Sequence, residues 1–242
     1  MDEIYESKYH LIEQKHWWCR SRRDIFLRFL KSTPRDARIL EIGCAGGLLL
    51  QALRANGFSN LTGIDLSKKA IQQCKRNGIA NAFVMDGAKT TFSTGSFDIV
   101  IASDILEHIP DDAAALREWQ RILKPGGKLI VFVPAFPFLW SEHDVINHHQ
   151  RRYQRQAFSR ILRSAGFSIE RLSAWNLSLF LPASLWRVSQ RVLPRKRTRD
   201  QAYLLPAVAN SLLTALLRVE NMLLTKINLP VGVSLFAVAR KR

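Results

Sequence analysis

A regular alternation of strand-like and helix-like segments between residues 38 and 133 constrains this chain more than any other feature. The strand-like segments are short and rich in Ile, Leu and Val, and glycine or an Asn-Gly pair ends the first two helix-like segments. Strands that alternate with helices of this length form βαβ units around a mostly parallel sheet. The expected strands are 38–42, 61–65, 82–85, 97–102 and 128–133, and the expected helices are 48–56, 68–76 and 113–123.

The second half of the chain follows a different pattern. A helix is expected at 158–165, and two further strands at 168–172 and 233–238. Residues 176–230 are apolar and basic and carry no strand signal, so they are expected to form a helical insertion before the last strand. The expected parts are an N-terminal arm at 1–30, an α/β core at 31–175 plus 231–242, and an amphipathic insertion at 176–230.

A loop of small residues follows the first expected strand. Residues 40–47 read Leu-Glu-Ile-Gly-Cys-Ala-Gly-Gly. Small residues between a strand and a helix let the backbone turn sharply and approach a ligand, and the helix start offers free N–H groups. A dinucleotide fingerprint needs Gly-x-Gly-x-x-Gly, and Ala45 and Leu48 stand at its second and third glycine positions. The loop therefore predicts a nucleotide-like ligand other than a dinucleotide.

The loop resembles the first motif of class I methyltransferases, an acidic residue followed by Gly-x-Gly-x-Gly, with Ala45 in place of the middle glycine. The match continues in order through Asp65, Asp86, the 97–100 segment and the 123–127 turn. This resemblance implies a Rossmann-like seven-stranded sheet with helices on both faces, and S-adenosylmethionine as cofactor. Asp65 would accept the ribose hydroxyls, and Asp86 would contact the adenine amino group. The cofactor-binding residues implied are Glu41, Gly43, Cys44, Ala45, Gly46, Gly47, Asp65, Leu66, Asp86, Gly87 and Ser103.

Two places offer a base for methyl transfer to a hydroxyl. His108 follows the fourth expected strand in a Glu-His pair, where it either assists catalysis or packs beneath the cofactor. His143, Asp144 and His149 follow the fifth strand, and histidine suits proton transfer near neutral pH. Their spacing matches no established metal site, so no metal is expected; the alternative is a solvated helix start. Cys19, Cys44 and Cys74 form no CxxC pair, which argues against a disulfide framework or a zinc site.

Further motifs carry a narrower resemblance. His16-Trp17-Trp18, the 139–153 segment and Leu-Pro-x-Gly-x-Ser-Leu at 229–235 resemble a bacterial branch of the type 11 methyltransferases, often linked to envelope lipid, polyene or glycan pathways. The resemblance implies that the N-terminal arm closes over the cofactor as a lid; alternatively, its tryptophans are core residues. The expected acceptor-binding residues are Trp17, Trp18, Arg151, Arg152 and Tyr153.

Charge and the insertion suggest where the acceptor lies. The 36 Lys and Arg residues exceed the 20 Asp and Glu residues, which favours phosphate-bearing partners. In the insertion, a basic run at 195–199 precedes an expected helix at 203–227 that is apolar apart from one narrow stripe. A membrane surface with anionic lipid is the favoured partner of this insertion, and a dimer interface or the core are the alternatives. The stripe consists of Asn210, Thr214, Arg218, Asn221 and Thr225.

Together these observations predict methyl transfer to an oxygen of a membrane-associated acceptor, such as a lipid-linked glycan, an isoprenoid phenol or a polyene head group. The N-terminus lacks an apolar stretch and no uncharged apolar run of spanning length occurs, so the expected location is the cytoplasm, peripheral on the inner face of the cell membrane. An RNA methyltransferase is the first alternative, although no motif for base amines is present. A non-catalytic protein that binds S-adenosylmethionine is the second.

Overall fold

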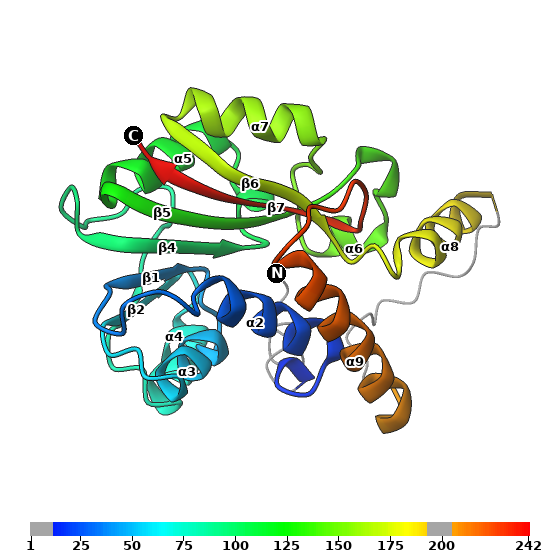
Figure 1. The fold of residues 1–242 in the computed structure, drawn as a ribbon, viewed down its shortest axis with the longest axis horizontal. Helices are drawn as coiled ribbons and strands as arrows, with labels where there is room; N and C mark the ends of the chain where they lie inside the picture. Colours follow the sequence, from blue (N-terminus) through cyan, green and yellow to red (C-terminus); the bar gives the residue numbers. More distant parts are fainter. Residues whose placement is uncertain (1–11, 193–204) are drawn as a thin grey trace.

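The computed structural model describes residues 12–192 and 205–242 and is built around one sheet of seven strands (Figure 1). The strands are β1 (Ile39–Ile42), β2 (Leu61–Asp65), β3 (Ala82–Val84), β4 (Phe97–Ser103), β5 (Leu123–Pro134), β6 (Phe167–Trp175) and β7 (Ser234–Lys241). Their order is β3-β2-β1-β4-β5-β7-β6. β1 to β5 are parallel, and β7 is antiparallel to both of its neighbours. The predicted Rossmann-like, mostly parallel sheet is confirmed.

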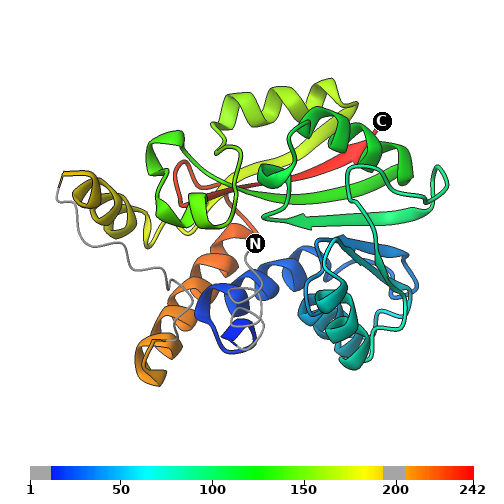
Figure 2. The ribbon, with the colours of Figure 1, turned by 180° about the vertical axis from the view of Figure 1, so that it is seen from behind.

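Helices cover both faces of this sheet. They are α2 (Trp17–Phe29), α3 (Leu48–Ala55), α4 (Lys68–Arg76), α5 (Asp112–Ile122), α6 (Glu142–Ile146), α7 (Arg155–Ser164), α8 (Phe180–Val192) and α9 (Ala207–Leu224), with short 3-10 turns η1 (Leu106–His108) and η2 (Pro137–Leu139). α2, α3 and α4 lie on one side, and α5 and α7 lie on the other (Figures 1 and 2). Because β1 to β4 all end at the same edge, the loops after these strands meet there.

Local chemistry explains where the elements begin and end. Ser67 caps α4, since its side chain accepts a hydrogen bond from the N–H of Ala70. Asp111 caps α5 in the same way, and this helix begins one residue before the expected start. The turn expected at 124–127 is a bulge within β5 rather than a boundary, because Leu123 already pairs with Phe97.

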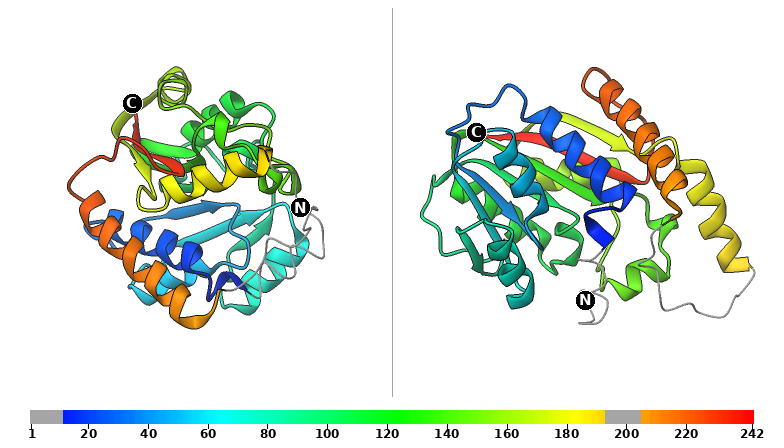
Figure 3. Two further views of the ribbon diagram at one scale, coloured as in Figure 1. Left: turned by 90° about the vertical axis from the view of Figure 1, so that its right-hand side faces the viewer. Right: turned by 90° about the horizontal axis from the view of Figure 1, so that it is seen from below.

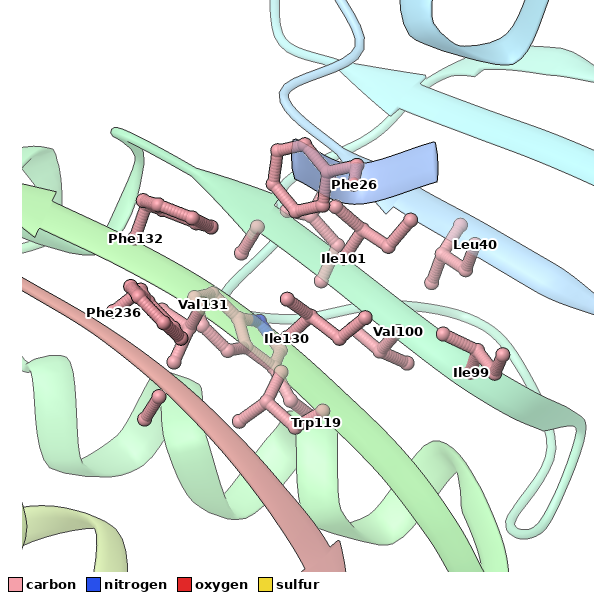
Figure 4. Close-up of a cluster of buried hydrophobic side chains, with 14 of the residues drawn as sticks. Phe26, Leu40, Ile99, Val100, Ile101, Trp119, Ile130, Val131, Phe132 and Phe236 are labelled. Atoms are coloured by element: carbon pink, nitrogen blue, oxygen red, sulfur yellow. The ribbon is translucent and has the colours of Figure 1, made fainter. Parts of the chain in front are cut away.

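The core is formed from both faces of the central strands. Val100, Ile130 and Phe132 are fully buried between a helix of each layer (Figure 4). Phe26 of α2 reaches the sheet from one side and packs its ring 5.1 Å from that of Phe132, whereas Trp119 of α5 lies on the other side. Burying a side chain of this kind contributes about 1.5–3 kcal/mol each. α2 is therefore fixed to the sheet as a structural layer.

The insertion between β6 and β7 contains α8 and α9, and α9 lies beside α2 (Figure 3). Three residues of the polar stripe of α9, Asn210, Thr214 and Asn221, face inward, whereas Arg218 and Thr225 are exposed. Asn210 accepts from the N–H of Trp17 and donates to the C=O of Lys15, and Asn221 donates to the C=O of Ser21. Leu217 and Leu224 lie in the core, but most of the apolar arc faces outward, so the alternative that the whole arc packs in the core is wrong. Its exposed side chains are Val208, Leu212, Leu216, Val219, Met222 and Leu223.

Some predictions fall outside the described residues. The basic run at 195–199, the first residues of the helix expected at 203–227, and the start of the N-terminal arm are among them. Within the described residues, α9 has the length and hydropathy of a membrane-spanning helix, but a third of it is buried in the fold and its polar stripe is bonded to α2. Length and composition alone therefore do not make it a spanning helix.

Candidate active site

The loop between β1 and α3 passes through three left-handed backbone conformations. The φ angle is 71° at Gly43, 45° at Ala45 and 76° at Gly47. A Cβ atom at Gly43 would collide with the side chain of Ile105, which follows β4. The loop is therefore pressed against the segment after β4, and only small residues fit there. Ala45 adopts the conformation that the family's middle glycine would supply.

Asp65 ties this loop to the end of β2. Its carboxylate accepts hydrogen bonds from the N–H groups of Ala45, at 3.0 Å, and Ser67, at 2.9 Å. Asp86 lies beyond β3 on the exposed rim, where its carboxylate accepts from the N–H of Ala88. Leu66 is 72% exposed. These residues line the carboxyl ends of neighbouring parallel strands, which is where ligands bind in sheets of this type.

Glu41 provides a test of whether the loop suits the cofactor. Its side chain is buried, and its Oε2 atom has no hydrogen-bond partner within the described part of the chain. Burial, followed by the nearby Glu13, raises the pKa of this carboxyl well above its usual range. A buried acceptor without a donor is costly unless a ligand supplies one. The ammonium group of S-adenosylmethionine is such a donor, so the residues present fit this cofactor.

The other predicted cofactor residues support the loop in different ways. Cys44 is buried under the loop, and a Cβ at Gly63 of β2 would lie 2.8 Å from its Sγ atom. The C=O of Gly46 accepts from Asn77, and the C=O of Gly87 accepts from the indole N–H of Trp119. Ser103 donates to the carboxylate of Asp104 at 3.0 Å. Gly47 directly precedes α3, in the left-handed conformation already noted.

Asp144 and His149 form a buried pair at the same edge. His149 Nδ1 lies 2.8 Å from Asp144 Oδ1, and Asp144 is completely buried. Arg152 Nε also donates to Oδ1, and the N–H of Ser141 donates to Oδ2, each at 2.8 Å. Although burial opposes ionisation, the hydrogen bond from His149 and the charge of Arg152 hold the pKa of Asp144 well below its usual range. Asp144 is therefore a carboxylate that orients His149.

His108 stands next to His149, with 4.7 Å between the ring centroids. Burial lowers the pKa of His108 to about 4, so its ring is neutral at physiological pH. The adjacent Glu107 is fully buried, and neither carboxyl oxygen has a hydrogen-bond partner among the described residues. Burial also raises the pKa of Glu107 well above its usual range. Glu107, His108 and His149 each offer a ligand atom, all within 4.8 Å of one another, so they could hold a divalent cation.

The structure joins the histidine pair to the loop through the segment after β4. The N–H of Gln150 donates to the C=O of Glu107 at 2.8 Å, while Ile105, two residues before Glu107, packs against Gly43. His143 lies behind His149, with a ring distance of 5.9 Å, and burial lowers its pKa to about 4. The sequence therefore predicted residues that do meet, with His149 between His108 and Asp144.

The expected acceptor-binding residues have partners inside the protein. Arg152 is buried and donates to Asp144 and to the C=O of Ala135. Arg151 pairs with Asp112, and so does the hydroxyl of the buried Tyr153. These contacts position the histidine segment, and a contact of these side chains with an acceptor stays a prediction.

The tryptophans of α2 pack on the sheet and its insertion. The ring of Trp18 lies 4.6 Å from that of Trp175 at the end of β6, and the N–H of Trp17 donates to Asn210. In the described part of the arm, both tryptophans therefore pack against the core, as the alternative to a lid expected. Their contact with an acceptor stays a prediction. Sequence reasoning did not select Arg22 or Asp104 as site residues. The available signals were that Arg22 follows Trp18 by four residues, one helical turn, and that Asp104 precedes the Glu107-His108 pair by three.

A cavity of about 700 Å³ lies at the opposite edge of the sheet. Its lining includes Arg38, Asp98 and Lys124, which stand near the starts of β1, β4 and β5. Ligands of parallel α/β sheets bind at the other ends of the strands. This cavity is therefore separate from the candidate active site.

Comparison with known proteins agrees with this geometry. Residues 13–172 match the family model described as a methyltransferase domain. A ubiquinone biosynthesis O-methyltransferase of Xanthomonas axonopodis pv. citri is 29% identical over 189 residues, which cover 70% of this chain and 76% of that protein. The protein of the same name from Xanthomonas oryzae pv. oryzae is 37% identical over 101 residues, but this match spans only 42% of its length and 39% of this chain.

Solved structures share the fold. A methyltransferase of Haloferax volcanii, in complex with the Trm112 methyltransferase activator, has a TM-score of 0.64 at 19% identity, covering 98% of this chain and 94% of that chain. A Thermotoga maritima S-adenosylmethionine-dependent methyltransferase has a TM-score of 0.61 at 16% identity and covers both chains fully, 100% of each. The family model spans most of the chain, and the matched residues include the loop, Glu41 and Asp65. The chain therefore belongs to the methyltransferase domain family and is a class I S-adenosylmethionine-dependent methyltransferase.

Proposed function

We propose that this enzyme methylates a hydroxyl oxygen of an amphipathic acceptor held at the inner face of the cell membrane, with an isoprenoid phenol as the first candidate. The observation that carries this proposal is the buried Asp144–His149 pair beside the cofactor loop. The relatives named ubiquinone biosynthesis O-methyltransferases support oxygen as the acceptor atom.

The chemistry follows from the state of Asp144. Because Asp144 is ionised, His149 donates from Nδ1, and its Nε2 atom is then the basic nitrogen. Such a nitrogen can take the proton from a hydroxyl as the oxygen attacks, which contributes about 10²–10⁴-fold to the rate. S-adenosylmethionine supplies the methyl group on a positively charged sulfur. Glu41 and Asp65 would hold the cofactor at its ammonium and ribose ends, and alignment of the two reactants supplies several more kcal/mol.

The exposed face of the insertion supports a membrane-held acceptor. Because Asn210 and Asn221 bond to α2, α9 cannot roll to hide its apolar arc. On α8, Leu181 and Leu185 are about 70% exposed, at 69% and 71%. Apolar surface of this extent favours a partner. The basic run at 195–199, between the two helices in sequence, favours anionic lipid over a second copy of the protein.

The reaction is tested with tritiated S-adenosylmethionine and a phenol that carries a short isoprenoid tail, on vesicles with anionic lipid. We expect label in the phenol ether with the wild type and at least a 100-fold lower rate with His149→Ala. His148→Asn is the matched control, since His148 is exposed and asparagine tolerates its left-handed backbone. Label that enters RNA instead would favour the nucleic-acid alternative.

Membrane binding is tested separately by co-sedimentation with anionic and neutral vesicles. Leu212→Glu with Leu216→Glu on the outer face of α9 is expected to abolish binding to anionic vesicles while leaving the fold intact. A homodimer that these variants dissociate, without vesicle binding by the wild type, would instead assign this face to self-association.

A fold alone does not fix the reaction: the [4+2]-cyclase SpnF shares this fold with a TM-score of 0.60 at 20% identity, covering 91% of this chain and 81% of its own. Cofactor binding without transfer to any membrane component would favour the non-catalytic alternative.

A further inference from the structure

The guanidinium of Arg22 is enclosed by aromatic rings. Its central carbon lies 4.1 Å from the ring centres of both Phe132 and Trp175, and 5.2 Å from that of Trp18. Arg22 belongs to α2, Phe132 to β5 and Trp175 to β6. The residue is only 5% exposed. The rings of Phe132 and Trp175 are nearly perpendicular, at 89°, so they contact the guanidinium from two directions, and a cation is attracted to ring faces and not to ring edges.

The enclosed cation is directed at the end of β4. Arg22 Nη2 lies 3.2 Å and 3.3 Å from the two carboxylate oxygens of Asp104 and donates to Ser234 Oγ at 3.1 Å. Asp104 directly follows β4, and its φ angle of 56° places it in the left-handed region. Ser103 also donates to its carboxylate. A buried arginine cannot lose its proton, so a paired carboxylate offsets much of the cost of burying its charge.

Asp104 stands where the candidate site begins. Its side chain is 35% exposed, unlike the buried Arg22, so it faces the edge at which the strands end. Glu107 and His108 follow within four residues, and the charge of Asp104 acts on both of them. One ion pair, between Arg22 and Asp104, therefore connects α2 to the edge of the sheet where the candidate active site lies. α2 itself supplies no other described acidic or basic contact to the end of β4.

We propose that Arg22 is a positioning residue that holds Asp104 in its place at the active site, so that methyl transfer requires α2 to be docked on the sheet. This inference rests on the proposed function only for the choice of acceptor. Arg22 acts through Asp104. When Asp104 is replaced by the neutral Asn, removal of the guanidinium therefore has no further effect on the active site. A residue that served only to stabilise α2 would instead act independently of Asp104.

A double-mutant cycle separates these two roles. Arg22→Met and Asp104→Asn are each expected to lower kcat at least tenfold, with the KM for S-adenosylmethionine changed less than twofold. The variant with both changes is expected to be no slower than Asp104→Asn alone. Arg22→Lys keeps the charge but not the planar fork, and is expected to recover part of the rate. If the double variant is slower by the product of the two single factors, the proposal is wrong.

The controls address folding and the acceptor. Arg28→Met removes an ion pair with Asp24 on the same helix, and is expected to leave kcat within twofold of the wild type. If Arg22→Met does not fold, as thermal unfolding would reveal, the cycle is run with Arg22→Lys. Tritiated S-adenosylmethionine and a membrane extract identify the acceptor. Label in RNA or protein would contradict the proposed function, while the cycle would still be measured on that acceptor.

Discussion

Asp144 Oδ1 lies 2.8 Å from His149 Nδ1, and Arg152 donates to the same oxygen atom. This arrangement fixes which histidine nitrogen is basic, because an ionised Asp144 can only accept. Asp144→Asn would present an amide, which permits the other tautomer of His149. We expect kcat to fall about 100-fold or more, with cofactor affinity unchanged. Asn147→Ala, which removes contacts to His143 but none to Asp144, is the control. Equal rates for Asp144→Asn and the wild type would exclude His149 as the base.

Glu41 is expected to release a proton when the cofactor binds. Its pKa is raised well above the usual range in the free protein, and the ammonium of S-adenosylmethionine would favour the ionised form. The binding enthalpy measured by calorimetry at pH 7 should therefore differ between phosphate and Tris buffers by up to one proton's ionisation heat. Glu41→Gln should bind more weakly and without this buffer dependence. A wild-type enthalpy that is the same in both buffers contradicts the assignment.

Asp65→Ala is expected to weaken S-adenosylmethionine binding by about 10–100-fold, since hydrogen bonds to a charged group contribute about 1.5–3 kcal/mol. Asp98→Asn is a matched control, because Asp98 is a bonded aspartate at the opposite end of β4, where it pairs with Lys124. That variant should lose stability but keep its cofactor affinity. Calorimetric titration of both variants distinguishes a ligand contact from a general loss of stability.

Ala45→Gly is expected to leave the free energy of unfolding unchanged or raise it by about 1 kcal/mol. The left-handed conformation of Ala45 costs about 1–2 kcal/mol, and glycine loses part of that gain through its freer unfolded chain. Ala52→Gly within α3 is the control and should lose about 1 kcal/mol. Urea unfolding measures both. Destabilisation of Ala45→Gly by as much as Ala52→Gly would mean that the loop is not strained.

The contribution of His108 and His143 to stability should fall as the pH drops from about 6.5 to about 4, opposite in sign to that of the buried Glu41 and Glu107. Burial lowers the pKa of His108 and His143 to about 4 from 6.5, so within this window the unfolded chain binds protons that the folded chain does not. The loss amounts to at most about 3 kcal/mol for each histidine, and it levels off below the folded pKa. Urea unfolding at pH 7 and pH 5 measures the change. His143→Gln should reduce the slope, and an unchanged slope would contradict the burial of that ring.

The sequence predicted the α/β core well because its information is local. The period of the apolar residues defined the strands, and Ser67 marked the start of α4. The acids at the ends of β2 and β3 were found through the resemblance to the class I methyltransferases. Arg152 shows the limit: its residue type suits an anionic ligand, but Asp144, eight positions away, takes its guanidinium. Pairing across the fold decides such a role, and a single sequence does not record it.

The orientation of α9 was hidden for a related reason. A stripe of polar residues on an apolar helix normally faces water, but here Asn210 and Asn221 of the stripe face α2. The sequence gives no sign that Asn210 meets the backbone of Trp17, because 193 residues separate them. Likewise, nothing local to Arg22 indicates that Asp104 is its partner. These contacts are long-range hydrogen bonds between polar groups, and the periodicity of apolar residues does not predict them.

Trp175 and Ser234 pair directly across β6 and β7, so the chain leaves the sheet and re-enters it at neighbouring positions. Apart from the contacts of α9 with α2, the chain between them can grow, shrink or be exchanged while the two strands keep their register. Evolution could therefore fit one methyl-transferring core to acceptors of different size and solubility by remodelling this single excursion. Relatives that share the glycine loop should differ most in length and polarity between the last two strands.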